Sequence, residues 1–456
     1  MTQDFDIIVI GGGPAGVAAA IRGVQLGATV CLVENKYWGG FCLNRACVPT
    51  KLLTTTLERV KTVQSASKMG FPNAAATLNP PALFKLKDEL VSYFSMGTHG
   101  LIKAKKVTPV QGRGRLAGAG RVAVDGKSYQ AKAIIIAAGA DWVRPAFPGS
   151  ELEGVINSSQ FLKEGRIPPR TLILGGSAWA VELGQFLDAC GGQVMLAVRE
   201  RGILNHFDQE IGQRLRSILK SSSMTIHNSC DIVSLAKDRK GLKAVLSVKE
   251  KEEAHLFDRI IYLERSPALD GLGLETVGLS DLTTNDQLAT KVPGIWAVGD
   301  AVGRIPFQSH SASAMGIIAA ENALGATISF NDKIVPRVAF TSPQAASVGL
   351  TEDEAEEAGY DVVTGAASMG ASPMAMIQGA TNGVVKVVGE KKYGELLGVH
   401  VLAPFATEII GTAALAIRME ATLDDLARTV LPHPTIAESL ADAARDALDW
   451  AIYSRD

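Results

Sequence analysis

Residues 5–16 read Phe5-Asp6-Ile7-Ile8-Val9-Ile10-Gly11-Gly12-Gly13-Pro14-Ala15-Gly16, a short apolar run that leads directly into spaced glycines. The apolar run is typical of a strand buried in a parallel sheet. In a G-x-G-x-x-G pattern, Gly11 allows a tight turn, Gly13 lets the backbone approach a pyrophosphate, and Gly16 lets the next helix pack close to the strand. The N-terminus of that helix favours phosphate. We therefore predict a dinucleotide-binding unit, whose phosphate site is lined by Gly11, Gly13, Pro14, Ala15 and Gly16.

A second strand follows this helix and ends in an acidic residue. Residues 29–33 form another largely apolar run, which leads into Glu34. A carboxylate at this position can accept hydrogen bonds from the ribose of an adenosine. The glycines alone are weak support, but strand, glycines, helix, strand and acid at this spacing together predict a bound dinucleotide.

The same arrangement occurs a second time along the chain. An apolar run at residues 171–174 enters Gly175, and the interval from Gly175 to Val198 equals that from Gly11 to Glu34. Two such units imply two dinucleotides.

The second unit departs from the glycine pattern. Ser177 replaces the second glycine, where it narrows the approach to a pyrophosphate but offers it a hydroxyl, and Ala180 replaces the third, where a small residue still allows close packing. The acid is absent, because its place is taken by Val198, which Arg199 and Arg201 follow. Arginine beside an adenosine ribose suits a 2′-phosphate, so NADP is favoured over NAD. The alternative is that both arginines are merely solvated.

Two cysteines follow the first unit closely. Residues 39–51 read Gly-Gly-Phe-Cys-Leu-Asn-Arg-Ala-Cys-Val-Pro-Thr-Lys, which places Cys42 and Cys47 with four residues between them and Lys51 just beyond. Zinc normally takes four ligands, and no second Cys/His cluster lies nearby in the sequence. A pair of buried core cysteines is the alternative, which the paired glycines, Pro49 and Lys51 disfavour. The motif predicts a reactive thiol pair beside the cofactor.

Composition excludes several classes of protein. The chain has 456 residues, of which 45 are basic and 47 acidic, so its net charge of −2 favours neither nucleic acid nor a membrane surface. No apolar stretch of about 18 residues is present, so no membrane-spanning helix is expected. The first strand begins at residue 5, which leaves no room for a secretory signal, and five cysteines do not indicate a disulfide framework. We expect a cytoplasmic protein of about three domains.

Two later motifs offer polar groups to a site. The run at residues 294–298 leads into Gly299 and Asp300, whose carboxylate can bind polyol hydroxyls. Near the C-terminus, His433 and Glu438 suit a general base with its orienting acid, or else a surface histidine before a helix. The other C-terminal elements are predicted as strands at 384–388 and 396–401 and a helix at 438–452.

The motifs that together form a recognisable order are Gly11/Gly13/Gly16 with Glu34, the box at 42–51, Glu182, Gly299-Asp300, Ser309-His310-Ser311-Ala312, Thr341-Ser342-Pro343, Ser347-Val348-Gly349 and His433-Pro434-Thr435-Ile436-Ala437-Glu438. In this order the chain resembles the flavin-dependent pyridine nucleotide–disulfide oxidoreductases over its whole length, and among them it is most similar to the dihydrolipoamide dehydrogenases. The resemblance implies an α/β fold, with two doubly wound, Rossmann-like dinucleotide-binding domains plus an α+β dimerisation domain. The implied segments are an FAD-binding domain with the redox disulfide (1–148), an NAD(P)-binding domain (149–268), a central segment that completes the FAD domain (269–331) and the dimerisation domain (332–456).

The resemblance also implies roles for the reactive groups. Cys47 would be the thiol nearest the flavin, and Cys42 would exchange with the substrate disulfide. His433, donated by the other subunit of a homodimer, would be the base that serves Cys42, with Glu438 orienting it. A thiolate is the nucleophile in such exchange, and FAD connects it to hydride chemistry that the protein alone cannot perform.

Other residues would hold the cofactors. Lys51 would lie near the flavin N5 and pair with Glu182, and Asp300 would hold the ribityl chain. The remaining residues placed at FAD or at the nicotinamide nucleotide are Gly40, Gly139, Gly299, Gly175, Ser177, Ala180, Arg199, Arg201 and Glu264.

Some positions depart from the family pattern. Phe41 stands where the family usually has threonine, and Ala46 where it has glycine. Trp179 is bulky for its place, and Glu264 replaces a glycine of the nicotinamide pocket. Negative charge there opposes the argument for NADP, because it lies where a phosphorylated cofactor would bind. We expect the nicotinamide site to be weak, unusual or lost.

We therefore predict a homodimeric FAD-dependent disulfide oxidoreductase. It would pass two electrons between a lipoyl-type dithiol, free or on a lipoyl-carrying protein, the Cys42–Cys47 pair, FAD and a nicotinamide nucleotide, with NADP(H) slightly favoured over NAD(H). One alternative is a glutathione-reductase-like NADPH reductase of another disulfide. Another is a flavin–disulfide enzyme that has lost nicotinamide use and works with another electron partner. A non-catalytic binding subunit is least favoured, and mercuric reductase is disfavoured because no cysteine follows Cys230.

Overall fold

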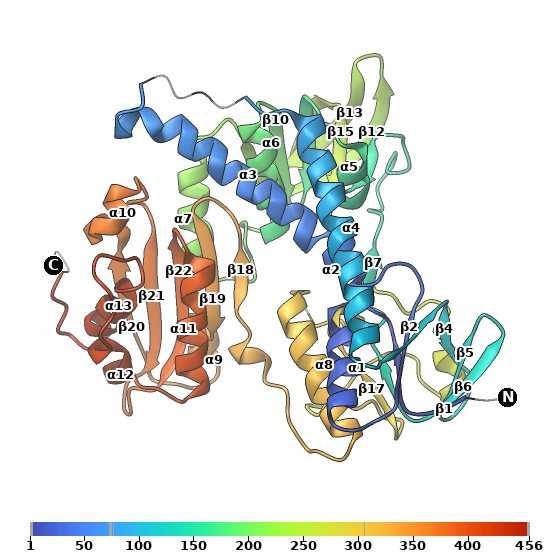
Figure 1. The fold of residues 1–456 in the computed structure, drawn as a ribbon. Coiled ribbons are helices and arrows are strands. Elements are labelled where there is room, and N and C mark those ends of the chain that lie inside the picture. The colour runs from blue at the N-terminus through green and yellow to red at the C-terminus, as the bar shows by residue number, and fades with distance from the viewer. Residues whose placement is uncertain (1–2, 73–74, 76, 305, 454–456) are drawn as a thin grey trace.

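The computed structural model describes residues 3–72, 75, 77–304 and 306–453. Figure 1 shows three parts, which we call the first, second and C-terminal parts, arranged around a region crossed by two long helices. Two sheets built mainly of parallel strands are flanked by helices, and a third, antiparallel sheet follows. The α/β fold class expected from the sequence is thus confirmed.

The first part is built on a sheet of strand order β3-β2-β1-β6-β5-β4, with β17 also paired to β6. Its strands are β1 (Gln3–Ile10), β2 (Val30–Glu34), β3 (Thr108–Gln111), β4 (Gly114–Leu116), β5 (Arg121–Val124), β6 (Lys127–Ile136) and β17 (Ile295–Ala297). The pairings are parallel except for the antiparallel extension β6-β5-β4. Because β17 joins β6, the chain returns to the first sheet after it has formed the second part.

Helices α1 (Pro14–Gln25) and α8 (Ser309–Ala323) lie side by side against this sheet (Figure 1). Small residues allow the two helices to approach closely. A Cβ atom on Gly316 of α8 would lie only 2.1 Å from the carbonyl oxygen of Ala15 on α1. The start of α8, which faces the cavity described below, is therefore held firmly against the glycine-rich turn.

The cysteine motif forms a short helix and the start of a long one. Helix α2 (Gly40–Arg45) and helix α3 (Cys47–Ser65) are separated only by Ala46, and α4 (Pro80–Ala104) follows. In Figure 1, α3 runs from the first part toward the C-terminal part. There the Glu58 Oε1 accepts a hydrogen bond of 3.0 Å from the Gln344 side chain.

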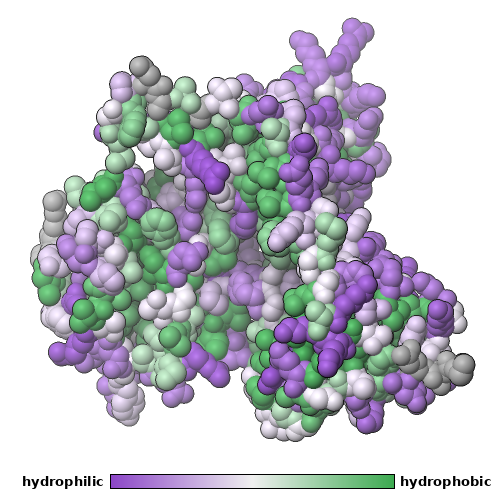
Figure 2. All heavy atoms as spheres, viewed as in Figure 1, coloured by the Kyte–Doolittle hydropathy of each residue, from purple (hydrophilic) through white to green (hydrophobic). Residues whose placement is uncertain are grey.

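The second part has a five-stranded parallel sheet of order β11-β10-β9-β15-β8. Its elements are β8 (Val155–Asn157), α5 (Ser158–Glu164), β9 (Arg170–Leu174), α6 (Ala178–Ala189), β10 (Gln193–Val198), α7 (Gln209–Leu219), β11 (Thr225–Asn228) and β15 (Arg259–Tyr262). An antiparallel meander of β12 (Cys230–Asp238), β13 (Gly241–Val248) and β14 (Lys251–Phe257) packs beside it. Figure 2 shows that the tip of this meander is strongly hydrophilic. The ribbon β7 (Ala140–Trp142) and β16 (Arg265–Pro267) lies where the chain leaves the first part and returns to it.

The C-terminal part is an antiparallel sheet of order β18-β19-β22-β21-β20 covered by helices. Its elements are β18 (Arg337–Ala339), β19 (Gln344–Gly349), α9 (Glu352–Glu357), β20 (Val362–Ser368), α10 (Pro373–Ile377), β21 (Val384–Glu390), β22 (Leu396–Ala403), α11 (Ala406–Arg418), α12 (Leu423–Arg428) and α13 (Ser439–Ala447). Short 3₁₀ helices elsewhere are Ala66–Met69, Leu274–Val277, Gly299–Val302, Asp332–Ile334 and Met369–Ala371.

The predicted strands at 384–388 and 396–401 are present as β21 and β22, but the predicted helix at 438–452 is wrong at its end. Helix α13 stops at Ala447, because Asp449 has a left-handed backbone (φ 59°) that an α-helix does not accommodate. The apolar spacing therefore continues past the point where the backbone leaves the helix. In the described part of the chain, no helix is long and apolar enough to cross a membrane.

Candidate active site

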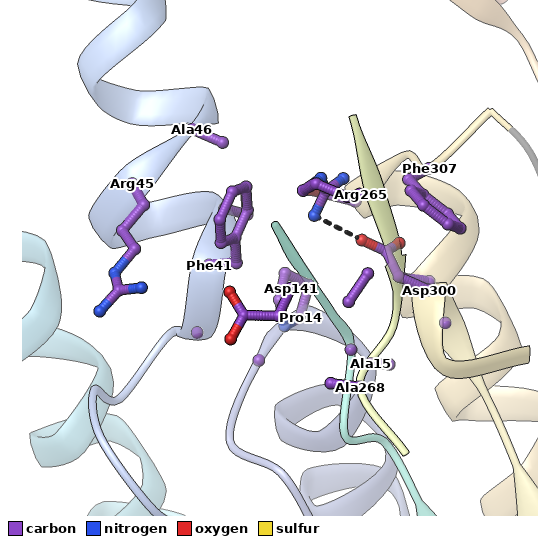
Figure 3. Close-up of a pocket in the computed structure, with 18 of the residues that line it drawn as sticks. Pro14, Ala15, Phe41, Arg45, Ala46, Asp141, Arg265, Ala268, Asp300 and Phe307 are labelled. Atoms are coloured by element: carbon purple, nitrogen blue, oxygen red, sulfur yellow. Dashed lines mark hydrogen bonds and ion pairs between the residues drawn. The ribbon is translucent and has the colours of Figure 1, made fainter. Parts of the chain in front are cut away.

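One large cavity, of about 1320 Å³, lies where the three parts meet. Its lining comes from the glycine turn and α2–α3 of the first part, from the start of α6 in the second, and from residues 338 and 340 of the C-terminal part. Figure 3 shows part of it, with Phe41 and Arg45 of α2 on one side and Arg265, Asp300 and Phe307 on the other. The volume exceeds that of a typical drug-sized pocket, as a site for dinucleotides requires.

The glycine turn of the first part fits a pyrophosphate. A Cβ atom on Gly16 would lie 1.8 Å from the carbonyl oxygen of Gly11, so the strand and helix meet as closely as the pattern predicts. A Cβ atom on Gly13 would meet nothing nearer than the Cα of Gly40, at 3.8 Å, and both glycines line the cavity. A side chain at Gly13 would therefore fill space that the cavity offers to a ligand.

Glu34 also lies at this cavity, buried at the end of β2. Its Oε2 accepts a hydrogen bond of 2.7 Å from the Gly12 N–H, and its Oε1 accepts from the N–H of Tyr37 at 3.0 Å. The backbone thus holds the carboxylate in a fixed direction. With a further bond from the Lys36 N–H it accepts three hydrogen bonds, and a carboxylate has about four lone-pair sites, so it retains capacity for a ribose hydroxyl.

The two cysteines of the motif face each other across the α2–α3 junction. Both are free thiols, and their sulfur atoms form a hydrogen bond. Cys47 is the first residue of α3, where the helix dipole favours negative charge. The Cys47 Sγ also lies 3.2 Å from the hydroxyl of Ser309, the first residue of α8.

These contacts separate the acidities of the two thiols. The hydrogen bond from Cys42 is the largest influence that lowers the pKa of Cys47, to about 7, with smaller contributions from Ser309 and from the nearby charges of Lys51 and Arg265. The pKa of Cys42 is strongly raised, first by its hydrogen bond to Cys47 and then by burial. Cys47 is therefore the thiolate of the pair, and Cys42 is its thiol.

Lys51 joins the three parts behind the thiols. Its Nζ lies 2.6 Å from Oε2 of Glu182 on α6, and 3.9 Å from the centre of the Phe340 ring. The other carboxylate oxygen of Glu182 accepts a hydrogen bond of 2.8 Å from the Phe340 N–H. The Glu182 side chain is 5% exposed, so it depends on these partners for its charge.

Asp300 has a partner that the sequence motif does not reveal. Its Oδ2 accepts a hydrogen bond of 3.0 Å from Arg265 of β16, as the dashed line in Figure 3 marks. The Arg265 guanidinium also lies 4.3 Å from the ring centre of Phe41 and 5.0 Å from that of Phe307. Burial raises the pKa of Asp300, while Arg265 opposes that rise. Asp300 and Arg265 both line the cavity, where they can hold a polyol.

An aromatic cluster, which we define as Phe41, Trp142, Trp179 and Tyr262, lies between the first and second parts. The ring centres of Phe41 and Trp142 are 5.2 Å apart, those of Trp142 and Trp179 are 5.5 Å apart, and those of Trp142 and Tyr262 are 6.3 Å apart. The buried Nε1 of Trp142 has no hydrogen-bond partner. The bulk expected from Trp179 therefore stands directly beside the residue that precedes Cys42.

The second glycine unit has the predicted form but not all of the predicted contacts. The Ser177 hydroxyl accepts a hydrogen bond of 3.3 Å from the Ala180 N–H and so caps α6, and Ala180 is completely buried in packing. Gly175 has open space where a Cβ would stand. The backbone turn is thus free for phosphate, while the serine hydroxyl is already engaged.

The arginines after β10 lie outside the cavity lining. Arg199 donates to Asp231 at 2.8 Å, and both side chains are well exposed. Arg201 is exposed too. Glu264 does line the cavity, and its charge also acts on Arg199. These contacts weaken the sequence argument for NADP, because the Arg199 guanidinium is already paired with the Asp231 carboxylate.

His433 and Glu438 form the predicted pair. The Nδ1 of His433 lies 2.9 Å from Oε2 of Glu438, while the Thr435 N–H donates to the other oxygen at 3.3 Å. The His433 side chain is 70% exposed on the C-terminal part and is not among the described residues that line the cavity of its own chain. The pair is therefore oriented, with its imidazole presented outward.

Sequence reasoning missed several residues of this site, namely Ser309, Arg265, Trp142 and Phe307. Ser309 begins the motif Ser309-His310-Ser311-Ala312, but nothing in the sequence connects it with Cys47. Trp142 follows the turn at Gly139, which lines the cavity as expected. Arg265 follows Glu264 directly, but nothing in the sequence connects it with Asp300.

Comparison with known proteins settles the family. Residues 5–316 match the family described as pyridine nucleotide-disulphide oxidoreductase, and residues 335–444 match the dimerisation domain of that family. The chain belongs to this family. The dihydrolipoyl dehydrogenase of Thermus scotoductus is 38% identical over 99% of both chains, and that of Haloferax volcanii is 32% identical over 98% of this chain and 97% of its own.

Solved structures support the fold of this oxidoreductase. LpdA from Mycobacterium tuberculosis superposes with a TM-score of 0.87 at 22% identity, covering 97% of this chain and 99% of its own. The flavoprotein disulfide reductase RclA from Escherichia coli gives a TM-score of 0.85 at 23% identity, with the same coverage. The predicted resemblance is thus confirmed: the protein is an FAD-dependent NAD(P)–disulfide oxidoreductase of the dihydrolipoyl dehydrogenase type, with a dimerisation domain at its C-terminus.

Proposed function

We propose that the enzyme oxidises a dihydrolipoyl group to its disulfide and passes the two electrons through Cys42–Cys47 and FAD to a nicotinamide nucleotide. The single observation that carries this proposal is the asymmetric thiol pair, with Cys47 as the thiolate beside the charge of Lys51. The names of the relatives support the choice of a lipoyl substrate, free or carried on a protein. The glycine turn, Glu34 and Asp300 would hold FAD.

The exchange begins from the oxidised Cys42–Cys47 pair. One substrate thiolate attacks the Cys42 sulfur, the bond between the two cysteines breaks, and Cys47 leaves as a thiolate. The second substrate sulfur then attacks the sulfur bound to Cys42, which closes the substrate disulfide and releases Cys42. The substrate has lost two electrons and two protons, of which Cys42 keeps one proton as its thiol and a base takes the other. Bound FAD supplies the two-electron connection from this dithiol to the nicotinamide.

The base in this scheme is His433 of the partner subunit. The substrate needs a base because Cys42 retains only one of the two protons that the substrate loses, and the raised pKa of Cys42 holds that proton in place. In each chain, Glu438 orients the imidazole and leaves its second nitrogen directed outward. Apolar residues exposed on the C-terminal part, including Phe405, Leu415 and Met419, suit burial in a dimer.

The first experiment tests the reactive thiol. In Cys42→Ser, we expect dihydrolipoamide oxidation to disappear while FAD stays bound. Cys190→Ser is the matched control, because Cys190 lies outside the cavity lining, and it should keep the activity. Unchanged turnover in Cys42→Ser would falsify the proposal.

A hybrid dimer tests the shared site. Cys42→Ser and His433→Gln should each be inactive as homodimers, but a randomly assorted mixture should recover about a quarter of wild-type activity, since half of the dimers are hybrid and each hybrid has one intact site. Recovery requires that the thiol and the imidazole come from different chains. A mixture that stays inactive would mean that His433 serves its own chain or no site at all.

A second candidate function is favoured by the aromatic cluster. Trp179 and Trp142 pack against each other at the wall of the cavity, where their bulk would hinder a nicotinamide, so the enzyme would exchange electrons with another partner instead. Anaerobic titration separates the two functions. Reduction of the bound flavin by NADH or NADPH supports the first, whereas reduction by dihydrolipoamide alone supports the second.

A further inference from the structure

The sulfur of Cys47 has two hydrogen-bonding neighbours, and only one of them belongs to the known cysteine motif. One is the thiol of Cys42. The other is the hydroxyl of Ser309, whose Oγ lies 3.2 Å from the Cys47 Sγ. A serine hydroxyl has one O–H donor, and a thiolate can only accept, so Ser309 is the donor whenever Cys47 is ionised.

Ser309 is held in place by the elements around it. It begins α8, and the next residue, His310, contacts the carbonyl oxygen of Pro336 through its Nε2 at 2.8 Å. Further along α8, Gly316 packs against the backbone of α1, as described above. The Ser309 hydroxyl is therefore held in a fixed position beside Cys47. The dipole of α8, whose N-terminus lies there, also favours negative charge on the sulfur.

One of the two hydrogen-bond donors to Cys47 is lost during the exchange. While Cys42 is covalently bonded to a substrate sulfur, it carries no S–H and cannot donate to Cys47. Lys51 and Arg265 contribute charge at a distance, but Lys51 is bound to Glu182 and Arg265 to Asp300. Ser309 is then the remaining side-chain donor seen on the sulfur among the described residues.

We propose that Ser309 is a catalytic residue, whose O–H stabilises the Cys47 thiolate when Cys42 is bonded to the substrate. This rests on the proposed function, in which a substrate thiolate attacks Cys42 and the electron pair of the broken S–S bond passes to Cys47. The hydrogen bond makes Cys47 a better leaving group in that step, and it also slows the reverse attack of Cys47 on Cys42.

The test uses the full-length holoenzyme carrying Cys42→Ala, which removes the first donor and leaves Cys47 alone beside FAD. The long-wavelength absorbance of a thiolate next to oxidised flavin is measured against pH. Adding Ser309→Ala should raise the midpoint of this absorbance by about one pH unit, which is a tenfold loss of thiolate at a given pH. Ser309→Thr should restore the midpoint, because it keeps the hydroxyl.

The matched control is Ser313→Ala, on the same helix but outside the cavity lining, which should leave the midpoint in place. A Ser309→Ala midpoint that moves no further than this control overturns the inference. If Ser309→Ala does not retain FAD, Ser309→Gly makes the same comparison. If the Cys42→Ala parent shows no long-wavelength absorbance at any pH, Cys47 is not beside the flavin, and the proposed function fails together with the inference.

Discussion

At the scale of single residues, the five cysteines share a side chain but differ in chemistry. Burial raises the pKa of Cys31 and of Cys190 to about 12, and that of Cys230 to about 11. The pKa of Cys47 lies below the ordinary value for a thiol, because Cys42 and Ser309 stabilise its anion. Reactivity is therefore set by hydrogen-bond donors near a sulfur and not by its exposure alone.

Alkylation of the reduced protein should follow this difference. At about pH 8, Cys47 is mostly thiolate, whereas thiols with a pKa of about 11 or more are ionised at most once in a thousand molecules. We expect iodoacetamide to modify Cys47 first, with peptide mass spectrometry as the measurement. Equal labelling of Cys230 would contradict this order. Lowering the pH through 7 should slow the labelling of Cys47, since protonation removes its nucleophile.

Lys51 should matter for stability as well as for chemistry. Lys51→Met leaves the buried carboxylate of Glu182 without its cation, which should lower the free energy of unfolding by about 3 kcal/mol and raise the pKa of Cys47. Lys51→Arg keeps the charge and serves as the control. Urea unfolding measures the first effect, and a Lys51→Met protein as stable as Lys51→Arg would show that the ion pair contributes little.

At the scale of secondary-structure elements, close helix contacts depend on the absence of side chains. Gly316→Ala on α8 would bring a methyl group to 2.1 Å from the Ala15 carbonyl of α1, so the helices must separate. We expect a loss of about 2 kcal/mol in stability and a weaker retention of FAD. Gly97→Ala on α4 is the matched control, because its Cβ would meet nothing within 4 Å, and it should be neutral or stabilising by about 1 kcal/mol. Thermal unfolding compares the two variants.

Local patterns explain which elements could be predicted from the sequence. Each strand–glycine–helix unit is contiguous, so its backbone requirements are visible in a short stretch, and the same holds for the cysteine motif and for the His433–Glu438 pair. The contacts of Cys47 with Ser309 and of Asp300 with Arg265 join distant segments, so no local pattern contains them. The end of α13 cannot be read from the sequence for a different reason: apolar spacing indicates which face is buried but not where the backbone leaves the helix.

At the scale of the whole molecule, buried charges connect the second and C-terminal parts. Asp208 caps α7, and its carboxylate lies 3.2 Å from the Nζ of Lys386 on β21, which also contacts Glu352 at 2.8 Å. The Asp208 side chain is 5% exposed and that of Lys386 is 12% exposed. His400 is fully buried nearby, and burial lowers its pKa, so it is neutral at pH 7. At this point of the junction, Asp208 and Glu352 thus share one cation, Lys386.

Removing that cation should weaken the junction. Lys386→Met leaves the buried carboxylate of Asp208 without a cation, and we expect a loss of about 3 kcal/mol in unfolding free energy. Lys391→Met, on an exposed turn beyond the same strand, should change little. Chemical denaturation of both proteins is the measurement, and equal stabilities would mean that the buried pair does not hold the two parts together.

The aromatic cluster should limit access to the cavity between the first and second parts. Trp179→Ala removes the indole that faces Trp142 and Phe41, which should open the approach to the flavin. We expect kcat/KM for NADH to rise by about tenfold, or 1.4 kcal/mol in transition-state free energy, with dihydrolipoamide exchange unchanged. Stopped-flow flavin reduction measures the effect, and a lower rate in Trp179→Ala would show instead that the indole helps to bind the nucleotide.

Glu182 is bound by two other parts of the molecule: by Lys51 of α3 in the first part and by the backbone N–H of Phe340 in the C-terminal part. Opening of either junction would expose a desolvated carboxylate to solvent at the same moment as it broke an ion pair. The three parts should therefore tumble as a single rigid body, with no hinge motion during turnover. Small-angle X-ray scattering should give the same radius of gyration for the oxidised and the reduced enzyme. Electrons would then move between the sites without movement of the domains.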